Sequence, residues 1–227
     1  MVVNESSSYK NIFLYKVYAW MSVALFISGL TAFFIASTPS LLAIIIQPMT
    51  MLIVTIATFI LAMIIQGAIN KISFQVMVFC YLLYAFLLGA LLSIIFIVFT
   101  HASIYSTFFV TAGMFAGVSF YGYFTKSDLS TLGSYAIMML WGIILASFMN
   151  FFWQNSMFHF LVSILGVIVF TALTAFDTQG VKQMAERSKS LDPCMLGKSI
   201  LSSAFLLYLD FVNLFLFLLR VLGSRKK

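Results

Sequence analysis

Two aspartates interrupt long apolar stretches of this chain of 227 residues. Asp210 lies near the middle of the segment 196–220, which is long enough to cross a bilayer, and Asp177 lies in the apolar segment before it. A charged side chain at the centre of a membrane costs about 2.5–3.5 kcal/mol on insertion scales, so an ionisable residue there marks a candidate functional site. The function of the chain therefore depends on these two carboxyl groups.

If the two carboxyl groups face each other in a medium of low dielectric constant, they cannot both ionise cheaply, so the pair shares a proton and titrates as a unit. Their oxygens are also the hard ligands that Ca²⁺ prefers, so protons and cations would compete for them. Asp177 and Asp210 are thus the candidate pH sensor and ion gate, with Ca²⁺ as a permeant or bound ion and no other cofactor. The alternative for each aspartate is a purely structural hydrogen bond between helices.

Three neutral side chains could support such a site. Thr174 precedes Asp177 at helical spacing, and Ser203 and Asn213 lie on the helical face of Asp210. Hydroxyl and amide oxygens can complete the coordination of a hard cation. We therefore expect these three residues to lie beside the carboxyl pair.

An intramembrane aspartyl protease would also use two such aspartates, one as base and one as acid. The signature of that enzyme class is YD on one helix and GxGD on the next. The corresponding strings here are FD at 176–177 and LYLD at 207–210, without a glycine before the second acid. We therefore predict that the chain is not an enzyme.

The composition indicates a membrane protein with several spans. Hydrophobic residues make up 63% of the chain and charged residues 8%, whereas soluble domains have roughly 45–50% and 25%. The net charge of +6 comes from basic residues in tails and connections, which indicates contact with lipid headgroups and excludes nucleic-acid binding. The cysteines and histidines lack metal-binding spacing.

Apolar runs follow one another with short connections, and each is long enough to span a membrane. The runs cover residues 17–37, 41–65, 74–98, 103–124, 132–153, 157–179 and 197–221. This pattern predicts an all-α membrane protein with seven transmembrane helices. The expected organisation is a polar N-terminal tail at 1–14, one seven-helix domain at 15–223 and a basic C-terminal tail at 224–227.

The basic residues predict the orientation in the membrane. Lys10 and Lys16 precede the first run, and the second, fourth and sixth connections between runs also carry lysines or arginines. The first, third and fifth connections carry none. The positive-inside rule therefore places the N-terminus in the cytoplasm. Seven full spans then leave the basic C-terminal tail on the outer face, against the same rule.

Glycines indicate where helices could approach one another closely. Gly113 and Gly117 form a GxxxG motif, a spacing typical of helix packing in membranes. We also expect close approaches at single glycines in other runs, namely Gly29, Gly89, Gly142 and Gly166.

Four strings, in this order, are similar to those of the Bax inhibitor-1 (transmembrane Bax inhibitor motif) family. They are GALLSIIFIVFT at 89–100, SFYGYFTKSDLSTLG at 119–133, AFDTQ at 175–179 and LYLDFVNLFLFLLRVLG at 207–223. Together with the seven apolar runs, the resemblance covers residues 10–223, and the chain is identified as a bacterial-type member of this family.

The resemblance implies seven helices with the C-terminal helix in the centre, and a pH-sensitive Ca²⁺ leak controlled by an aspartate pair. Carried over by motif, that pair is Asp177 and Asp210, the same two residues that stand out as charges in apolar segments. One departure concerns the second apolar run, where some members carry a further acid. This run holds only neutral polar residues, namely Gln47, Thr50, Thr55, Thr58 and Gln66.

The leading hypothesis is a passive, pH-gated Ca²⁺ leak in a bacterial inner membrane. The alternative is a non-conducting regulator of membrane-protein quality control or cell death, which would bind a membrane protease or another membrane protein through its tails. A proton-coupled transporter of small solutes is a third hypothesis. The sequence leaves the oligomeric state open.

Overall fold

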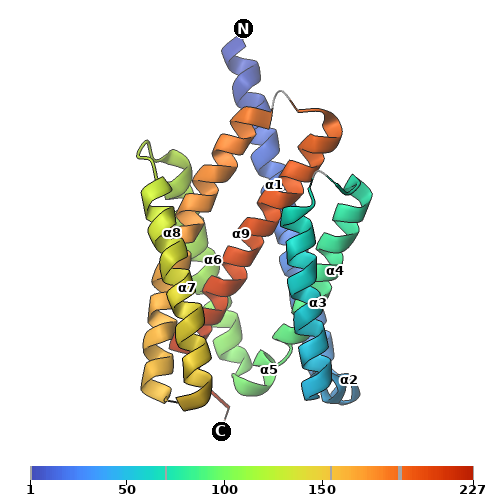
Figure 1. Ribbon diagram of the computed structural model, residues 1–227, viewed down its shortest axis with the longest axis vertical. Coiled ribbons are helices and arrows are strands. Elements are labelled where there is room, and N and C mark those ends of the chain that lie inside the picture. The colour runs from blue at the N-terminus through green and yellow to red at the C-terminus, as the bar shows by residue number, and fades with distance from the viewer. Residues whose placement is uncertain (1, 70, 154, 189–190, 227) are drawn as a thin grey trace. The chain divides into compact units, whose positions relative to one another are not determined.

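The computed structural model describes residues 2–69, 71–153, 155–188 and 191–226, and their side chains except those of 2–8 and 150–153. Seven helices within these ranges are long and apolar enough to cross a membrane. The prediction of an all-α protein with seven transmembrane helices is therefore confirmed (Figure 1).

Nine helices are described, and two of them are short. Their bounds are α1 (Val2–Ser37), α2 (Pro39–Ile45), α3 (Pro48–Gly67), α4 (Phe74–Leu92), α5 (Ile95–Val98), α6 (His101–Phe124), α7 (Ser130–Trp153), α8 (Ser156–Arg187) and α9 (Pro193–Leu222). The spanning helices are α1, α3, α4 with α5, α6, α7, α8 and α9.

Two predicted runs are broken where their sequence disfavours a continuous helix. The run 41–65 is divided into α2 and α3, because Pro39 and Pro48 each stand at the start of a helix, where the missing N–H costs nothing. The run 74–98 is interrupted at Ser93, whose buried hydroxyl donates to the carbonyl oxygen of Ala90. A serine that bonds to its own backbone in this way competes with helix formation.

Three helices extend beyond their predicted apolar runs: α1 and α9 at their starts, and α8 at its end. The backbone of the polar segment 2–14 belongs to α1, and α8 continues past its apolar part to Arg187. α9 begins at Pro193, where the carboxylate of Asp192 accepts hydrogen bonds from the amides of Cys194 and Met195 at 3.2 and 3.3 Å. Such a carboxylate satisfies amides that have no partner inside the helix.

The chain divides into two compact units. Unit 1 consists of residues 1–99, 183–208 and 226–227, and unit 2 of residues 100–182 and 209–225. The division falls inside α8 and inside α9, so each of these helices contributes one part to each unit.

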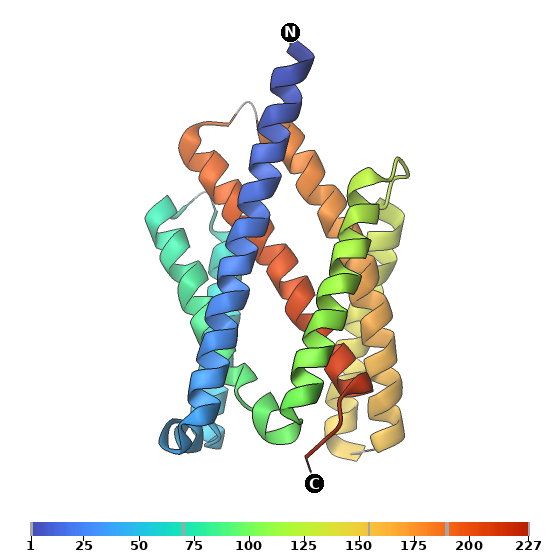
Figure 2. The same cartoon turned by 180° about the vertical axis from the view of Figure 1, so that it is seen from behind.

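Unit 1 is built on close packing of α1 against α4. A Cβ added at Gly89 of α4 would lie 2.6 Å from the carbonyl oxygen of Ser28 in α1, so only glycine allows this approach. The Ser28 hydroxyl also lies 2.6 Å from the phenol oxygen of Tyr208 in α9. Figure 2 shows α1 running along this unit to α2.

Unit 2 contains α6, α7, most of α8 and the end of α9. A Cβ added at Gly122 of α6 would lie 2.4 Å from the carbonyl oxygen of Ala175 in α8, and one added at Gly166 of α8 would meet the ring of Phe217 in α9. The ring of Phe211 in α9 packs edge-on against that of Phe115 in α6, with centroids 5.5 Å apart. Glycines and aromatic rings thus set the distances between these helices.

α9 supplies the core of both units. In its apolar stretch 61% of residues are buried, compared with at most 39% in the other spanning helices described. Leu201 and Phe205 are fully buried in unit 1, and Leu214 is fully buried in unit 2. The expectation that the C-terminal helix is central is confirmed.

The expected close approaches at glycines are confirmed at Gly89 and Gly166 and wrong at the GxxxG motif. Among the described residues nothing lies within 4 Å of a Cβ added at Gly113 or Gly117, and the same holds for Gly29 and Gly142. Their spacing fits helix packing, but the face of α6 that packs against α8 is the face of Gly122.

We expect Gly122→Ala to destabilise the protein by about 1–3 kcal/mol, the usual cost of overpacking. The added methyl group would collide with the backbone of α8 rather than with a movable side chain. Thermal unfolding in detergent micelles should show a lower midpoint. Gly113→Ala is the matched control on the same helix, and its midpoint should stay equal or rise, because alanine is favoured over glycine in helices by roughly 0.5–1 kcal/mol. Equal midpoints for the two variants would contradict this packing.

Candidate functional site: an aspartate pair in the membrane

Asp177 is held by the contacts of its two neighbours in α8. The ring of Phe176 lies against Gly133 of α7, where a Cβ would be 2.5 Å from ring carbons. On the other side, the buried hydroxyl of Thr178 donates to the Ser119 hydroxyl oxygen of α6 at 3.3 Å. These contacts fix the turn of α8 that carries Asp177.

Asp210 is held in the same way in α9. The next residue, Phe211, packs against the rings of Phe108 and Phe115 in α6, with centroids 5.6 and 5.5 Å away. Only 5% of the surface of Asp210 is exposed. A carboxyl group at this depth has little access to solvent, so its environment must come from the protein.

The structure brings the two predicted aspartates together. The side chains of Asp177 and Asp210 contact each other within hydrogen-bonding range, both inside unit 2. Oδ2 of Asp210 is buried and accepts no hydrogen bond from any of the donors that the structure describes. A buried acceptor without a partner is costly, and a hydrogen bond between two carboxyl groups requires a proton on one of them. The geometry thus suits a pair that shares one proton.

The three candidate supporting residues lie in spanning helices, but their hydrogen bonds do not reach the pair. Thr174 is buried and its hydroxyl donates to the Phe170 carbonyl oxygen, and the Asn213 amide donates to that of Leu209, each one turn earlier in its own helix. Ser203 is buried in the part of α9 that belongs to unit 1. Among the described residues, none of the three hydrogen-bonds to Asp177 or Asp210.

The carboxyl pair offers few ligands for a resident metal ion. No group of three or more His, Cys, Asp or Glu side chains that could hold a metal is found in the part of the chain that the structure describes. Ca²⁺ takes six to eight oxygen ligands, and two carboxylates supply at most four. The two carboxylates alone therefore do not complete the ligand shell of Ca²⁺.

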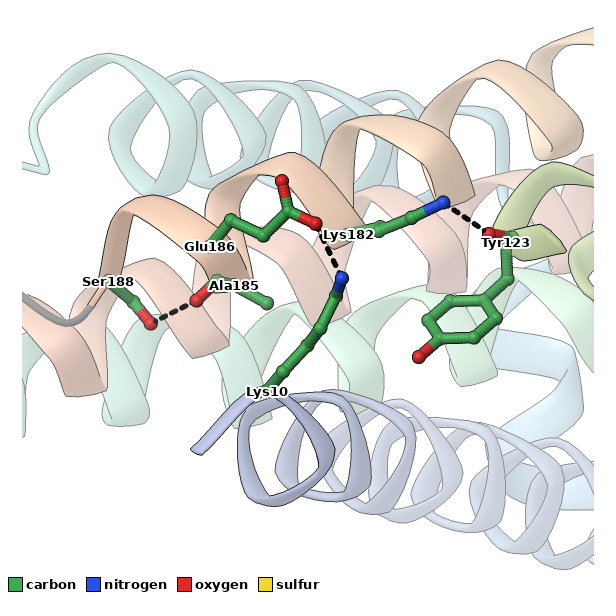
Figure 3. A network of polar contacts seen from close by, with 6 residues as sticks. All are labelled: Lys10, Tyr123, Lys182, Ala185, Glu186 and Ser188. Carbon is green, nitrogen blue, oxygen red and sulfur yellow. Dashed lines mark hydrogen bonds and ion pairs between the residues drawn. The ribbon is translucent and has the colours of Figure 1, made fainter. Parts of the chain in front are cut away.

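Two side chains of α8, Gln179 and Lys182, hold the connection between α6 and α7. The sequence does not mark either residue as functional. The Gln179 side chain accepts from the Leu129 amide at 2.9 Å and donates to the Ser127 carbonyl oxygen at 2.8 Å. Lys182 donates to the Tyr123 carbonyl oxygen at 2.7 Å, as Figure 3 shows. Gln179 stands two residues after Asp177, so the same part of α8 carries the carboxyl group and fixes this connection.

The same connection carries Asp128, whose side chain bonds to the first residue of α7. The Asp128 carboxylate accepts hydrogen bonds from the hydroxyl and the amide of Ser130, which lower its pKa below the ordinary value. The signal for these contacts was present in the sequence, because SFYGYFTKSDLSTLG and AFDTQ are two of the four family-like strings. Neither string shows by itself that the two segments touch.

An ion pair in unit 1 joins α1 to the end of α8. The ammonium group of Lys10 contacts the carboxylate of Glu186, and Figure 3 shows the two side chains extended toward each other. Near the same helix end, the Ser188 hydroxyl donates to the Ala185 carbonyl oxygen. The polar start of α1 is therefore attached to this unit.

These features define an integral membrane protein of seven helices with a carboxyl pair on two of them, in which Asp210 is buried and Asp177 is half-buried. Residues 10–227 match the model of the family described as "Inhibitor of apoptosis-promoting Bax1". An uncharacterized protein of Borreliella burgdorferi is 44% identical over 96% of this chain and 94% of its own length. Inner membrane protein YbhL of Escherichia coli strain K12 is 43% identical over 94% of this chain and 92% of its own length. The chain belongs to the Bax inhibitor-1 family, which is described as an inhibitor family and not as an enzyme family.

We expect Gln179→Ala to loosen the connection between α6 and α7. The variant leaves the amide of buried Leu129 without an acceptor, at a cost of about 1–3 kcal/mol. Hydrogen exchange at Leu129 and trypsin cleavage after exposed Lys126 should both become faster. Gln75→Ala, which removes an exposed glutamine in unit 1, is the control and should change neither rate. Unchanged exchange at Leu129 in the Gln179 variant would show that the glutamine does not hold this segment.

Proposed function

We propose that this membrane protein is a passive cation leak, selective enough to pass Ca²⁺, and that the proton shared by Asp177 and Asp210 controls it. The observation that carries the proposal is the interaction between the half-buried carboxyl group of Asp177 and the buried one of Asp210, which lie on different spanning helices. With one proton the pair is a hydrogen bond that holds α8 to α9. Without it the pair is two like charges in contact.

The free energy of that repulsion is the proposed source of gating. Two unit charges 4 Å apart interact with about 4 kcal/mol at an effective dielectric constant of 20. This exceeds the roughly 0.5–1.5 kcal/mol of an ordinary hydrogen bond, so loss of the proton favours separation of the two helices at this turn. The separated carboxylates then provide hard oxygen ligands for an entering cation.

Ca²⁺ acts as cargo in this proposal. The ionised pair attracts the ion, and a donor set of only two carboxylates releases it again, because conduction requires binding that is weak enough to leave. Flux should therefore rise as the pH rises through the range in which the pair loses its shared proton.

The proposed location is a bacterial inner membrane with the N-terminus in the cytoplasm. The E. coli relative is named as an inner membrane protein, and the basic residues favour this orientation. The C-terminal tail then ends on the other side: in unit 1, Lys226 donates from its amide to Val98 and from its ammonium group to Phe96. These carbonyls belong to α5, which follows the end of α4 far from the N-terminal end of α1 (Figure 2).

The experiment is Ca²⁺ flux into liposomes that carry the purified protein, over a range of about pH 6–8 where a coupled carboxyl pair can titrate. One linked proton allows the flux of the parent to change by up to about tenfold per pH unit, and in Asp210→Asn the change should fall below about twofold, because the amide cannot ionise. Asp128→Asn, which neutralises an exposed acid outside the pair, is the control and should keep the parent's pH dependence.

Two outcomes would contradict the proposal. A leak whose pH dependence survives in Asp210→Asn would show that the pair is not the gate. Absence of Ca²⁺ flux at every pH, with the protein folded and inserted, would favour the non-conducting regulator that binds a membrane protease or another membrane protein. Deletion of residues 1–9 should then abolish that regulation.

A further inference from the structure

Lys198 in the second turn of α9 is a buried cation without a partner. Only 6% of its surface is exposed. Its ammonium group makes no hydrogen bond or ion pair with any residue that the structure describes. Most of this side chain is shielded from solvent, so an anionic acceptor from outside the described chain would stabilise its ammonium group.

The described acidic side chains are engaged elsewhere. Each contacts another group: Glu186 contacts Lys10, Asp192 accepts from the amides at the start of α9, Asp128 accepts from Ser130, and Asp177 and Asp210 contact each other. None of these carboxylates neutralises Lys198. The described part of the chain thus presents a positive charge in unit 1 without its own counter-charge.

Gln66 of α3 adds a second unused donor in the same unit. Its Oε1 accepts from the Ser202 hydroxyl at 2.8 Å, while its Nε2 is buried and has no hydrogen-bond partner among the described residues. Ser202 follows Lys198 by one helical turn, so their side chains share a face of α9. The ammonium group of Lys198 is not fully enclosed, unlike Nε2 of Gln66, so a ligand can reach it without unfolding α9.

The distance of Lys198 from the start of α9 is similar to the thickness of the polar layer of a membrane. It stands five residues after Pro193, where α9 begins, and at 1.5 Å per residue this is about 7.5 Å along the helix. The polar layer on each side of a bilayer is roughly 5–8 Å thick. A Cβ added at Gly197 would lie 2.9 Å from the ring of Phe74, so the start of α9 lies beside the start of α4. Both views show the two at the same end of unit 1 (Figures 1 and 2).

We propose that Lys198 binds the phosphate of an anionic phospholipid, seated between the start of α9 and the connection from α3 to α4. Exposed Lys71 in that connection adds a second positive charge at the same end of unit 1. Basic pockets between transmembrane helices recognise lipid headgroups in this way. Because the acids described are engaged elsewhere, nothing in the site pairs with the ammonium of a zwitterionic headgroup, which favours a lipid such as phosphatidylglycerol over phosphatidylcholine.

The experiment measures lipid binding to the full chain in detergent micelles by native mass spectrometry, with phosphatidylglycerol and phosphatidylcholine as the probes. The unmodified protein should retain phosphatidylglycerol preferentially. Lys198→Met, which keeps the length of the side chain and removes its charge, should bind phosphatidylglycerol at least about fivefold more weakly. Lys198→Arg should retain binding, and Lys126→Met, which removes an exposed lysine in unit 2, should bind as the parent does.

Three results would overturn the proposal. The first is equal retention of the two lipids by the unmodified protein, a test that needs no variant to fold. The second is unchanged phosphatidylglycerol binding in Lys198→Met. The third is displacement of the lipid by an equal concentration of soluble glycerophosphate, because the site would then serve a soluble phosphate compound rather than a membrane lipid.

Discussion

The constraint on which this structure depends is the cost of an unpartnered polar group inside a membrane. Serine and threonine hydroxyls meet it locally by donating to the carbonyl one turn earlier, as Thr174 does in α8. A carboxyl group has no such local solution, since it needs a donor. Asp177 and Asp210 interact with each other instead, while Oδ2 of Asp210 has no hydrogen-bond partner among the described residues.

The packing around the pair is set by small distances rather than by many polar contacts. Gly122 brings α6 against Ala175 of α8, and Gly133 makes room for Phe176. Both contacts involve residues within two positions of Asp177. The turn that carries the carboxyl group is therefore held by van der Waals contact with α6 and α7. Gln179 adds hydrogen bonds to the connection between α6 and α7. The turn of α8 that carries Asp177 is thus fixed by packing and by hydrogen bonds.

The sequence predicted most of the fold because apolar length and charge placement determine spans in a membrane. The seven helices were predicted in this way, and so were Asp177 and Asp210 as the notable charges, whereas the central position of the last helix was implied by the family resemblance. Helix ends were predicted less well, since α1 and α8 continue through polar residues at the membrane surface, where hydropathy gives no signal. The contact between Gln179 and the 127–129 backbone could not be predicted, because it depends on which faces of α6, α7 and α8 meet.

The position of α9 in the chain has a consequence for biosynthesis. It supplies buried residues to both units, and it follows the six other spanning helices in this sequence. Until it enters the membrane, unit 1 lacks Phe205 and Tyr208, unit 2 lacks Phe211, and Asp177 lacks the carboxyl group that it contacts. Without α9, the six preceding spanning helices have an incomplete interior. A chain truncated before α9 would be an exposed folding intermediate rather than a smaller version of the protein.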